Sequence, residues 1–263
     1  MKTCNFIVIK VGLLLLIVIS TTPLYSQWSN NPAVNTPVDI GSDDAEPLSV
    51  TTSDGKTIIS YYKIDWINYN MYIQVLDAQG VKQLAPIGQL ISAFPSGSAI
   101  FQYHLAIDQA DNAILSFQDE RTGSQACVAY KFTTTGTQLW GPNGVVLGSG
   151  LAPHAAPLPS GDVVIGWNPP SAGSISYQKY DATGTGIWPS VKSYTHPGGG
   201  NISFPRMFAL SNNEFIMLYK KQAGTFFITN VYAQRFDVNG DPVWPNPVLL
   251  TTGVTNAVNP LNI

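Results

Sequence analysis

One thirteen-residue pattern recurs four times along the chain and constrains the fold more than any other feature of the sequence. Each copy contains alternating apolar and polar residues, then a turn with a shared glycine, and then a large apolar residue four positions after that glycine. The copies are residues 72–84, 128–140, 176–188 and 232–244. The shared glycines are Gly80, Gly136, Gly184 and Gly240, spaced by 56, 48 and 56 residues. An internal period of about fifty residues is the signature of a repeat architecture.

The repeated element has the features of a β-hairpin. Three copies place an aspartate three residues before the glycine, at Asp77, Asp181 and Asp237. Such an aspartate caps the turn, while the glycine adopts the positive φ that other residues resist. We expect the large residue after the turn to begin the return strand. That position holds Leu84, Trp140, Trp188 or Trp244.

A second turn signal lies upstream in every copy, and an apolar segment of strand length follows it. The signals are Asp54-Gly55, Asp111-Asn112, Gly161-Asp162 and Asn212-Asn213. Each unit therefore has room for four short strands, which is the size of a β-propeller blade. The sequence predicts an all-β fold, a β-propeller built of four-stranded blades. A β-sandwich is the alternative, but it would not explain four copies in register.

The composition excludes several other classes of protein. Only 11% of the residues are charged, with 23 Gly, 19 Pro and a formal net charge of −3. This balance argues against a coiled coil, a charge-rich disordered chain and a basic surface for nucleic acid. Three His and two Cys leave little material for a zinc site, and we expect no metal.

The first 26 residues have the pattern of a secretory signal peptide. Lys2 and Lys10 precede an apolar run over residues 11–19, and small residues follow up to Gln27. The run would rise only about 14 Å as a helix, too short for a bilayer core of roughly 30 Å. We expect cleavage after Ser26, a mature chain of residues 27–263 without a transmembrane segment, and a secreted or cell-surface location.

The repeat resembles a class of secreted repeat proteins of Bacteroidetes-type bacteria. Their blades contain the pattern Y-A-Q-R-x-D-x-x-G-x-x-x-W, which residues 232–244 match closely. Residues 117–121 and 140–145 match the flanking parts of the blade, except that Phe117 replaces a Trp. More distantly, the Gly-x-x-x-Trp element is similar to quinoprotein-like propeller repeats. That resemblance implies a propeller, but the hairpin alone does not bind a quinone, so no cofactor is expected.

The two ends of the chain resemble parts of blades. Residues 28–32, which begin with Trp28, look like the outer strand of a blade whose inner strands are absent. Asn259-Pro260-Leu261 repeats Glu46-Pro47-Leu48, where an inner strand is expected to begin. We therefore expect about four blades plus partial blades at both ends, in an incomplete or open propeller. A closed four-bladed ring is the competing interpretation.

Alignment of the first strand of each blade identifies the candidate binding residues. One equivalent position holds Leu48, His104, His154, Arg206 and Leu261. First strands line the central channel of a propeller, so His104, His154 and Arg206 are expected to converge there. They could form an anion or carboxylate site, or the two His could belong to a metal site. Alternatively, these side chains only bond to neighbouring backbone and water.

Other chemistry-bearing residues have structural interpretations. Asp119-Glu120-Arg121 is expected to be a surface turn with a local Asp–Arg pair, because adjacent carboxylates rarely straddle a sugar bond. The repeated aspartates are expected to cap turns rather than bind calcium, which takes 6–8 oxygens. The recurring Trp residues are expected to pack between blades. Cys127 lies in an apolar strand and is expected to be a core residue.

These observations favour a non-catalytic protein with no catalytic residue. The expected function is a secreted binding or adhesion scaffold for a protein or glycan ligand. The alternative is an extracellular glycan-active enzyme, a hydrolase or lyase, with its site at the channel mouth or in a part of the protein outside this sequence. A glycosidase of the sialidase type is disfavoured, because its arginine cluster would need Arg121, Arg206 and Arg235, the only arginines present.

Overall fold

The computed structural model describes residues 37–39, 44–66, 68–97, 102–222 and 229–251. The predicted signal peptide over 1–26, the strand expected at 28–32 and Leu261 lie outside the described residues. Within the described part every regular element is a β-strand, and no helix there is long and apolar enough to span a bilayer.

The strands form four antiparallel sheets, and in each sheet the strands are neighbours in chain order. Blade 1 consists of β1 (Asp44–Thr51), β2 (Thr57–Asp65), β3 (Asn68–Leu76) and β4 (Gln89–Leu90). Blade 2 consists of β5 (His104–Ile107), β6 (Ala113–Asp119), β7 (Ala126–Phe132) and β8 (Val145–Ser149). Blade 3 consists of β9 (Leu151–Pro157), β10 (Val163–Asn168), β11 (Ser174–Tyr180) and β12 (Lys192–Thr195). Blade 4 consists of β13 (Ile202–Ala209), β14 (Phe215–Gln222), β15 (Thr229–Phe236) and β16 (Val248–Leu249).

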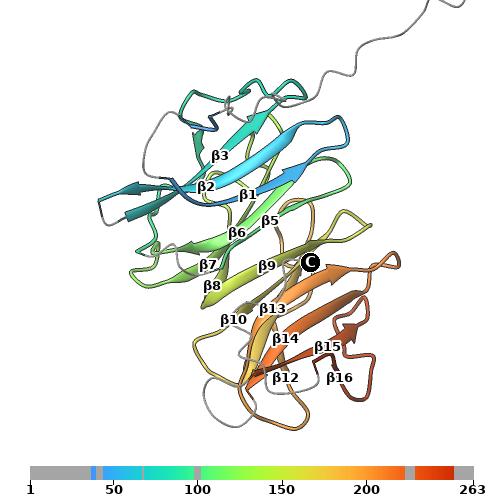
Figure 1. Ribbon diagram of the computed structural model, residues 1–263. Helices are drawn as coiled ribbons and strands as arrows, with labels where there is room; N and C mark the ends of the chain where they lie inside the picture. The colour runs from blue at the N-terminus through green and yellow to red at the C-terminus, as the bar shows by residue number, and fades with distance from the viewer. Residues whose placement is uncertain (1–36, 40–43, 67, 98–101, 223–228, 252–263) are drawn as a thin grey trace, which may run out of the picture. The chain divides into compact units, whose positions relative to one another are not determined.

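This architecture confirms the predicted all-β propeller of four-stranded blades. Figure 1 shows the blades following one another from the blue blade 1 to the orange and red blade 4. Neighbouring blades pack face to face through their first strands, with β1 against β5, β5 against β9, and β9 against β13. No interface of similar size joins blade 1 to blade 4 among the described strands, so the four described blades form an open propeller.

The turn chemistry follows the expectation for the repeated hairpin. The shared glycines all have positive φ, between 79° and 84°. In blade 3, Asp181 Oδ1 accepts the backbone N–H groups of Thr183 and Thr185 at 2.8 and 2.9 Å. Asp77 and Asp237 make the same pair of bonds in their own turns. These aspartates are turn caps, as predicted.

The return strand begins later than the sequence suggested. The expectation that the large residue after the turn starts this strand is wrong, because the outer strands start four or five residues further on. Trp140 and Trp188 instead leave their own sheet and are buried, at 5% and 7% exposure. Their rings pack on the following blade, which requires a connection rather than a strand at this point.

Each of these Trp rings meets the shared glycine of the next blade. Trp140 Nε1 donates to the carbonyl oxygen of Ala182 at 3.1 Å, and a Cβ on Gly184 would lie 2.9 Å from the same ring. A Cβ on Gly240 would lie 2.7 Å from the Trp188 ring. The shared glycine is therefore needed twice, for its backbone conformation and for the close approach of the preceding blade.

Three hydrophobic clusters connect the blades in series. One joins blades 1 and 2 around Tyr62 and Phe117, one joins blades 2 and 3 around Ile165, and one joins blades 3 and 4 around Phe215. The face of blade 1 that points away from blade 2 carries a smaller cluster around Tyr61, against which Val38 packs. The second strands of blades 2 and 3 are consequently buried on both faces over most of their length.

The aligned first-strand position that holds Leu48, His104, His154 or Arg206 is called the channel position. In each blade it pairs with one residue of the second strand, and this residue differs in blade 4. This residue is small in the first three blades, where it contacts the next blade's first strand, and large in the fourth. The four residues are Ser60, Ser116, Gly166 and Leu218. Ser116 Oγ donates to the carbonyl oxygen of Pro153, and a Cβ on Gly166 would lie 2.9 Å from Met207 Sδ. Close approach of neighbouring blades thus depends on small residues at this position.

Candidate functional site

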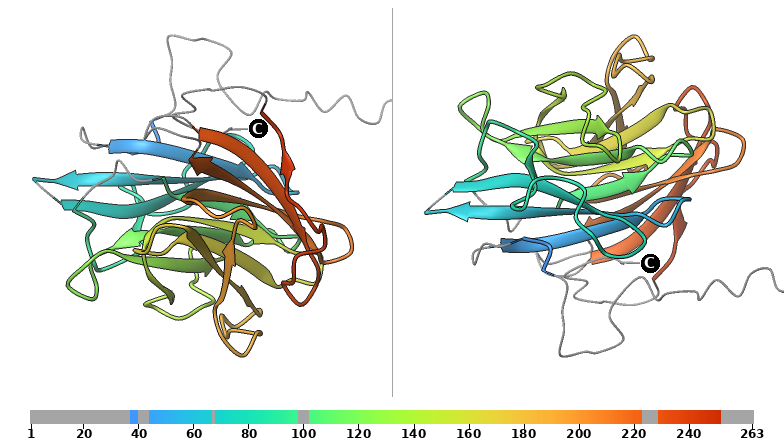
Figure 2. Two further views of the ribbon diagram at one scale, coloured as in Figure 1. Left: turned by 90° about the horizontal axis from the view of Figure 1, so that it is seen from below. Right: turned by 90° about the horizontal axis from the view of Figure 1, so that it is seen from above.

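The first strands bring the three predicted site residues together at one cavity. His104, His154 and Arg206 pair with equivalent positions of their own second strands, which matches the alignment made from the sequence. All three side chains line a cavity of about 470 Å³, together with residues of β1 such as Leu48. Figure 2 shows the four blades from below and from above the view of Figure 1. The cavity is lined by the first strands of all four blades.

The two histidines form a stacked pair that also connects the blades. Their ring centroids lie 3.5 Å apart, and the ring planes differ by 19°. His104 Nδ1 accepts the backbone N–H of Ala155 at 3.3 Å, and His154 Nδ1 accepts that of Met207 at 3.1 Å. Each imidazole therefore bonds to the first strand of the following blade. This is the backbone bonding that the sequence offered as the alternative to a ligand role, and it occupies one nitrogen of each ring.

The surroundings of both rings favour the neutral imidazole. Burial, reinforced by the positive charge of Arg206, lowers the pKa of His104 to about 3. Burial also holds the pKa of His154 well below its ordinary value, and the neighbouring His104 and Arg206 add to this effect. The histidines are neutral at physiological pH, so the positive charge at the cavity belongs to the arginine.

Arg206 extends from blade 4 toward the beginning of blade 2. One Nη atom donates to Gln102 Oε1 at 2.5 Å, and the side chain is half-buried. Burial lowers the pKa of the guanidinium. In the described parts of the chain no carboxylate forms an ion pair with Arg206, and no carboxylate lines the cavity. The site thus combines one cation with two neutral imidazoles.

A second cation, which the sequence did not single out, lies close to the arginine. Lys220 on β14 is buried, and its Nζ lies 4.9 Å from the centroid of the Phe204 ring. Burial and the charge of Arg206 both lower the pKa of Lys220. Lys220 is followed by Lys221 near the end of a strand, a pattern typical of surface residues. Its burial could therefore not be inferred from the sequence. The positive charge near the channel is larger than the three aligned residues suggest.

The first strands of three blades have a strained backbone at the same place. Glu46, Ala152 and Phe204 have φ values of 53°, 51° and 55°. Each residue directly precedes the proline that recurs before the channel position, and each is associated with a β-bulge. A left-handed conformation is unfavourable for such residues and clusters at functional sites. The recurring proline was the sequence signal for this feature.

Amide side chains stabilise two of these bulges from the preceding blade. Gln118 Oε1 accepts the backbone N–H of Ala152 at 3.0 Å, and Asn168 Oδ1 accepts that of Phe204 at 2.8 Å. Because the bulge is anchored across the blade interface, the direction of the following channel residue is set by two blades at once. His154 and Arg206 each follow two residues after such a bulge.

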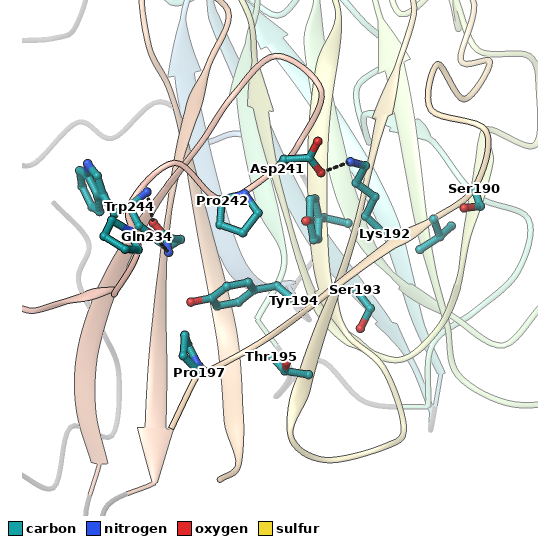
Figure 3. A pocket seen from close by; sticks show the side chains of 13 residues that line it. Ser190, Lys192, Ser193, Tyr194, Thr195, Pro197, Gln234, Asp241, Pro242 and Trp244 are labelled. Atoms are coloured by element: carbon teal, nitrogen blue, oxygen red, sulfur yellow. Dashed lines mark hydrogen bonds and ion pairs between the residues drawn. The ribbon is translucent and has the colours of Figure 1, made fainter. Parts of the chain in front are cut away.

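A larger depression of about 710 Å³ lies away from the channel, between blades 3 and 4. Figure 3 shows its side chains, most of which come from β12 and its flanking residues and from the connection before β16, with Tyr177 of β11 and Gln234 of β15. Its two charged groups neutralise each other, since Lys192 Nζ lies 2.6 Å from Asp241 Oδ1. In this view the Trp244 ring lies beyond Gln234, away from that ion pair. Trp244 is half-buried, unlike Trp140 and Trp188, so the predicted inter-blade packing is confirmed for those two residues only.

The predicted local pair of Asp119 and Arg121 is present, and its two side chains are buried. Arg121 Nε and Nη2 donate to the Asp119 carboxylate at 2.7 to 3.1 Å, and both side chains are buried. The expected surface turn is present, since Glu120 and residues 122–124 are exposed, but the Asp–Arg pair at its base is buried beneath residues 92–94. Ser92 Oγ donates to the same carboxylate at 2.9 Å, and the guanidinium lies 5.1 Å from the Phe94 ring centroid. The pair connects the end of blade 1 to blade 2.

No protein-family model matches the chain, and no curated protein matches it. Solved structures do match. A glycoside hydrolase of Bacteroides ovatus shares 9% identity and a TM-score of 0.47, over 79% of this chain and 72% of its own. An α-L-arabinofuranosidase of Clostridium thermocellum shares 11% identity and a TM-score of 0.45, over 80% and 72%. An endo-arabinase of Bacteroides thetaiotaomicron shares 14% identity and a TM-score of 0.45, over 82% and 84%.

These matches correct one expectation. The non-catalytic binding or adhesion scaffold is contradicted, because the similar structures are described as glycoside hydrolases, in agreement with the alternative drawn from the sequence. At these identities and TM-scores the likeness concerns the fold alone.

Proposed function

We propose that this protein is a glycan-active enzyme whose substrate binds in the central channel. The observation that carries the proposal is the convergence of His104, His154 and Arg206, from three different blades, at one cavity of about 470 Å³. That volume is within the usual range for small-molecule sites, roughly 300 to 1,000 Å³. The strained residues two positions before Leu48, His154 and Arg206 add support, since bulges commonly direct side chains at such sites.

The side chains that line the channel cavity indicate which types of reaction are possible there. Hydrolysis by two carboxyl groups needs acidic side chains on both sides of the sugar bond, and the described lining contains none. Arginine is suited to a planar oxyanion, because its guanidinium can donate two parallel hydrogen bonds to it. Both hydrolase and lyase activity therefore have to be measured, with neutral and with acidic glycans.

Export through the predicted signal peptide would bring the enzyme to polymeric glycans outside the cell. This part of the proposal rests on residues 1–26 of the sequence alone. It is tested by sequencing the N-terminus of the protein recovered from culture medium, which should begin at Gln27.

The activity is tested with the mature chain on a panel of neutral and acidic oligosaccharides. New reducing ends report hydrolysis, and the ultraviolet absorbance of an unsaturated sugar reports elimination. We expect turnover of at least one substrate and a loss of about tenfold or more in Arg206→Gln, the effect of removing one charge-assisted interaction. Lys192→Gln, in the depression outside the channel, is the matched control and should retain activity. Equal activity of Arg206→Gln and the parent protein, or no turnover of any substrate, would overturn the proposal.

A further inference from the structure

The hydrogen bonds of the two channel histidines determine which nitrogen carries the proton. A neutral imidazole has one N–H group and one acceptor nitrogen. In both His104 and His154 the acceptor is Nδ1, because it receives a backbone N–H from the following blade. The remaining proton is therefore on Nε2 in both rings. Each ring offers the channel a hydrogen-bond donor.

This protonation pattern is inconsistent with the metal alternative considered from the sequence. A metal ion binds the lone pair of a ring nitrogen, and here the lone pair of Nδ1 is already used while Nε2 carries the proton. Among the described residues no group of three His, Cys, Asp or Glu side chains is arranged to hold a metal ion. The two histidines consequently act on a ligand as donors.

Arg206 adds further donors and the charge. Its guanidinium has five N–H groups and no acceptor, and within the described residues Gln102 Oε1 accepts one of its hydrogen bonds. A cation taken partly out of water without a carboxylate partner is unfavourable. An anion in the cavity would relieve this cost and accept the remaining bonds.

We propose that the channel binds the oxyanion of an acidic saccharide, a carboxylate or a sulfate ester, through Arg206 and the Nε2–H groups of His104 and His154. The saccharide part of this inference rests on the proposed function, whereas the oxyanion part rests on the donor pattern alone. Lys220 contributes long-range attraction, since it is buried and its charge interacts with that of Arg206.

The protonation pattern can be measured independently of any ligand. The protein has only three histidines, His104, His154 and His196, so long-range proton–nitrogen NMR spectra can be assigned with single variants. At neutral pH His104 and His154 should both show the Nε2–H form. An Nδ1–H form at either residue would overturn the donor pattern.

Ligand binding is then measured by calorimetry with four probes: inorganic sulfate, an oligogalacturonate, a sulfated galactose oligosaccharide and a neutral galactose oligosaccharide. We expect the acidic saccharides to bind about tenfold or more tightly than the neutral one, corresponding to about 1.4 kcal/mol, and to weaken as salt is raised. Arg206→Gln should abolish the preference and Arg206→Lys should reduce it, because lysine keeps the charge but not the paired donors. Lys192→Gln should leave the preference unchanged.

The outcomes separate the two proposals. Equal affinity for neutral and acidic saccharides would refute the oxyanion site and leave the glycan function intact. Binding of sulfate without any saccharide would retain the oxyanion site and count against the glycan function. Failure of all four probes would overturn both. Thermal melting of each variant shows that a lost preference does not come from unfolding.

Discussion

Trp188 lies against Gly240 so closely that a Cβ on the glycine would fall 2.7 Å from the indole ring. The contact joins blades 3 and 4, and it belongs to the same series as the contact of Trp140 with Gly184. The two residues of each contact occupy the two most regular positions of the repeat. One sequence pattern thus supplies both halves of a blade interface.

Gly240→Ala should destabilise the protein more than its backbone conformation alone explains. A left-handed alanine costs about 1–2 kcal/mol, and overpacking against Trp188 adds about 1–3 kcal/mol. Gly161→Ala is the matched control, because Gly161 also has positive φ but has open space around its Cβ position. Chemical denaturation of both variants measures the difference. In a Trp188→Ala background the extra cost of Gly240→Ala should disappear, and its persistence would contradict the contact.

Asp119→Ala should be strongly destabilising. It removes the buried partner of the Arg121 guanidinium, and leaving one charge of a buried pair uncompensated costs about 3–5 kcal/mol. Asp241→Asn, which breaks the exposed pair with Lys192, should cost only about 0–1 kcal/mol. Equilibrium unfolding in urea compares the two variants. Similar small losses in both would show that the Asp119–Arg121 pair is not buried in solution.

Mild acid should weaken the fold through the channel histidines. The pKa of His104 is lowered to about 3 in the folded state, whereas in the unfolded chain it is about 6.5. The unfolded state therefore takes up a proton first as pH falls, so stability is complete above pH 6.5 and decreases below it. For His104 the loss between pH 7 and pH 5 is roughly 2 kcal/mol. His154 acts in the same direction.

The acid effect is measured as the change in unfolding free energy over this window. His104→Asn keeps an acceptor for the Ala155 N–H but does not titrate, so it should flatten the dependence on pH. A slope equal to that of the parent protein would show that His104 is already charged in the fold.

Cys127 should not react in the native protein. The residue is fully buried on β7, and burial raises the pKa of its thiol above the ordinary value. A thiol reagent should label it only after unfolding, which makes the labelling rate a measure of opening. Rapid labelling under native conditions would contradict the burial of β7.

The repeat made most of the fold predictable. Turn glycines, capping aspartates and the equivalence of Leu48, His104, His154 and Arg206 depend on local backbone conformation and on a fixed period. Local backbone preference and the period can both be recognised in a single sequence. The late start of the return strands could not be predicted, because it results from Trp140 and Trp188 packing on a neighbouring blade.

The candidate site was predictable in position but not in chemistry. Alignment brought the two histidines and Arg206 to one channel, yet their protonation depends on the backbone N–H groups of Ala155 and Met207, which belong to other blades. The burial of Lys220 likewise depends on the strained segment at Phe204. Contacts between different repeats determine these properties, whereas the spacing of the repeat along the sequence gives no information about them.

The small residues that face the next blade, Ser60, Ser116 and Gly166, have a consequence for how such a chain can evolve. The fourth unit has Leu218 in their place, so a first strand packed on that residue would lie further away than in the other interfaces. Exchange of this unit with one of the other three would therefore need a compensating substitution. The blades share one sequence pattern, but they are not exchangeable.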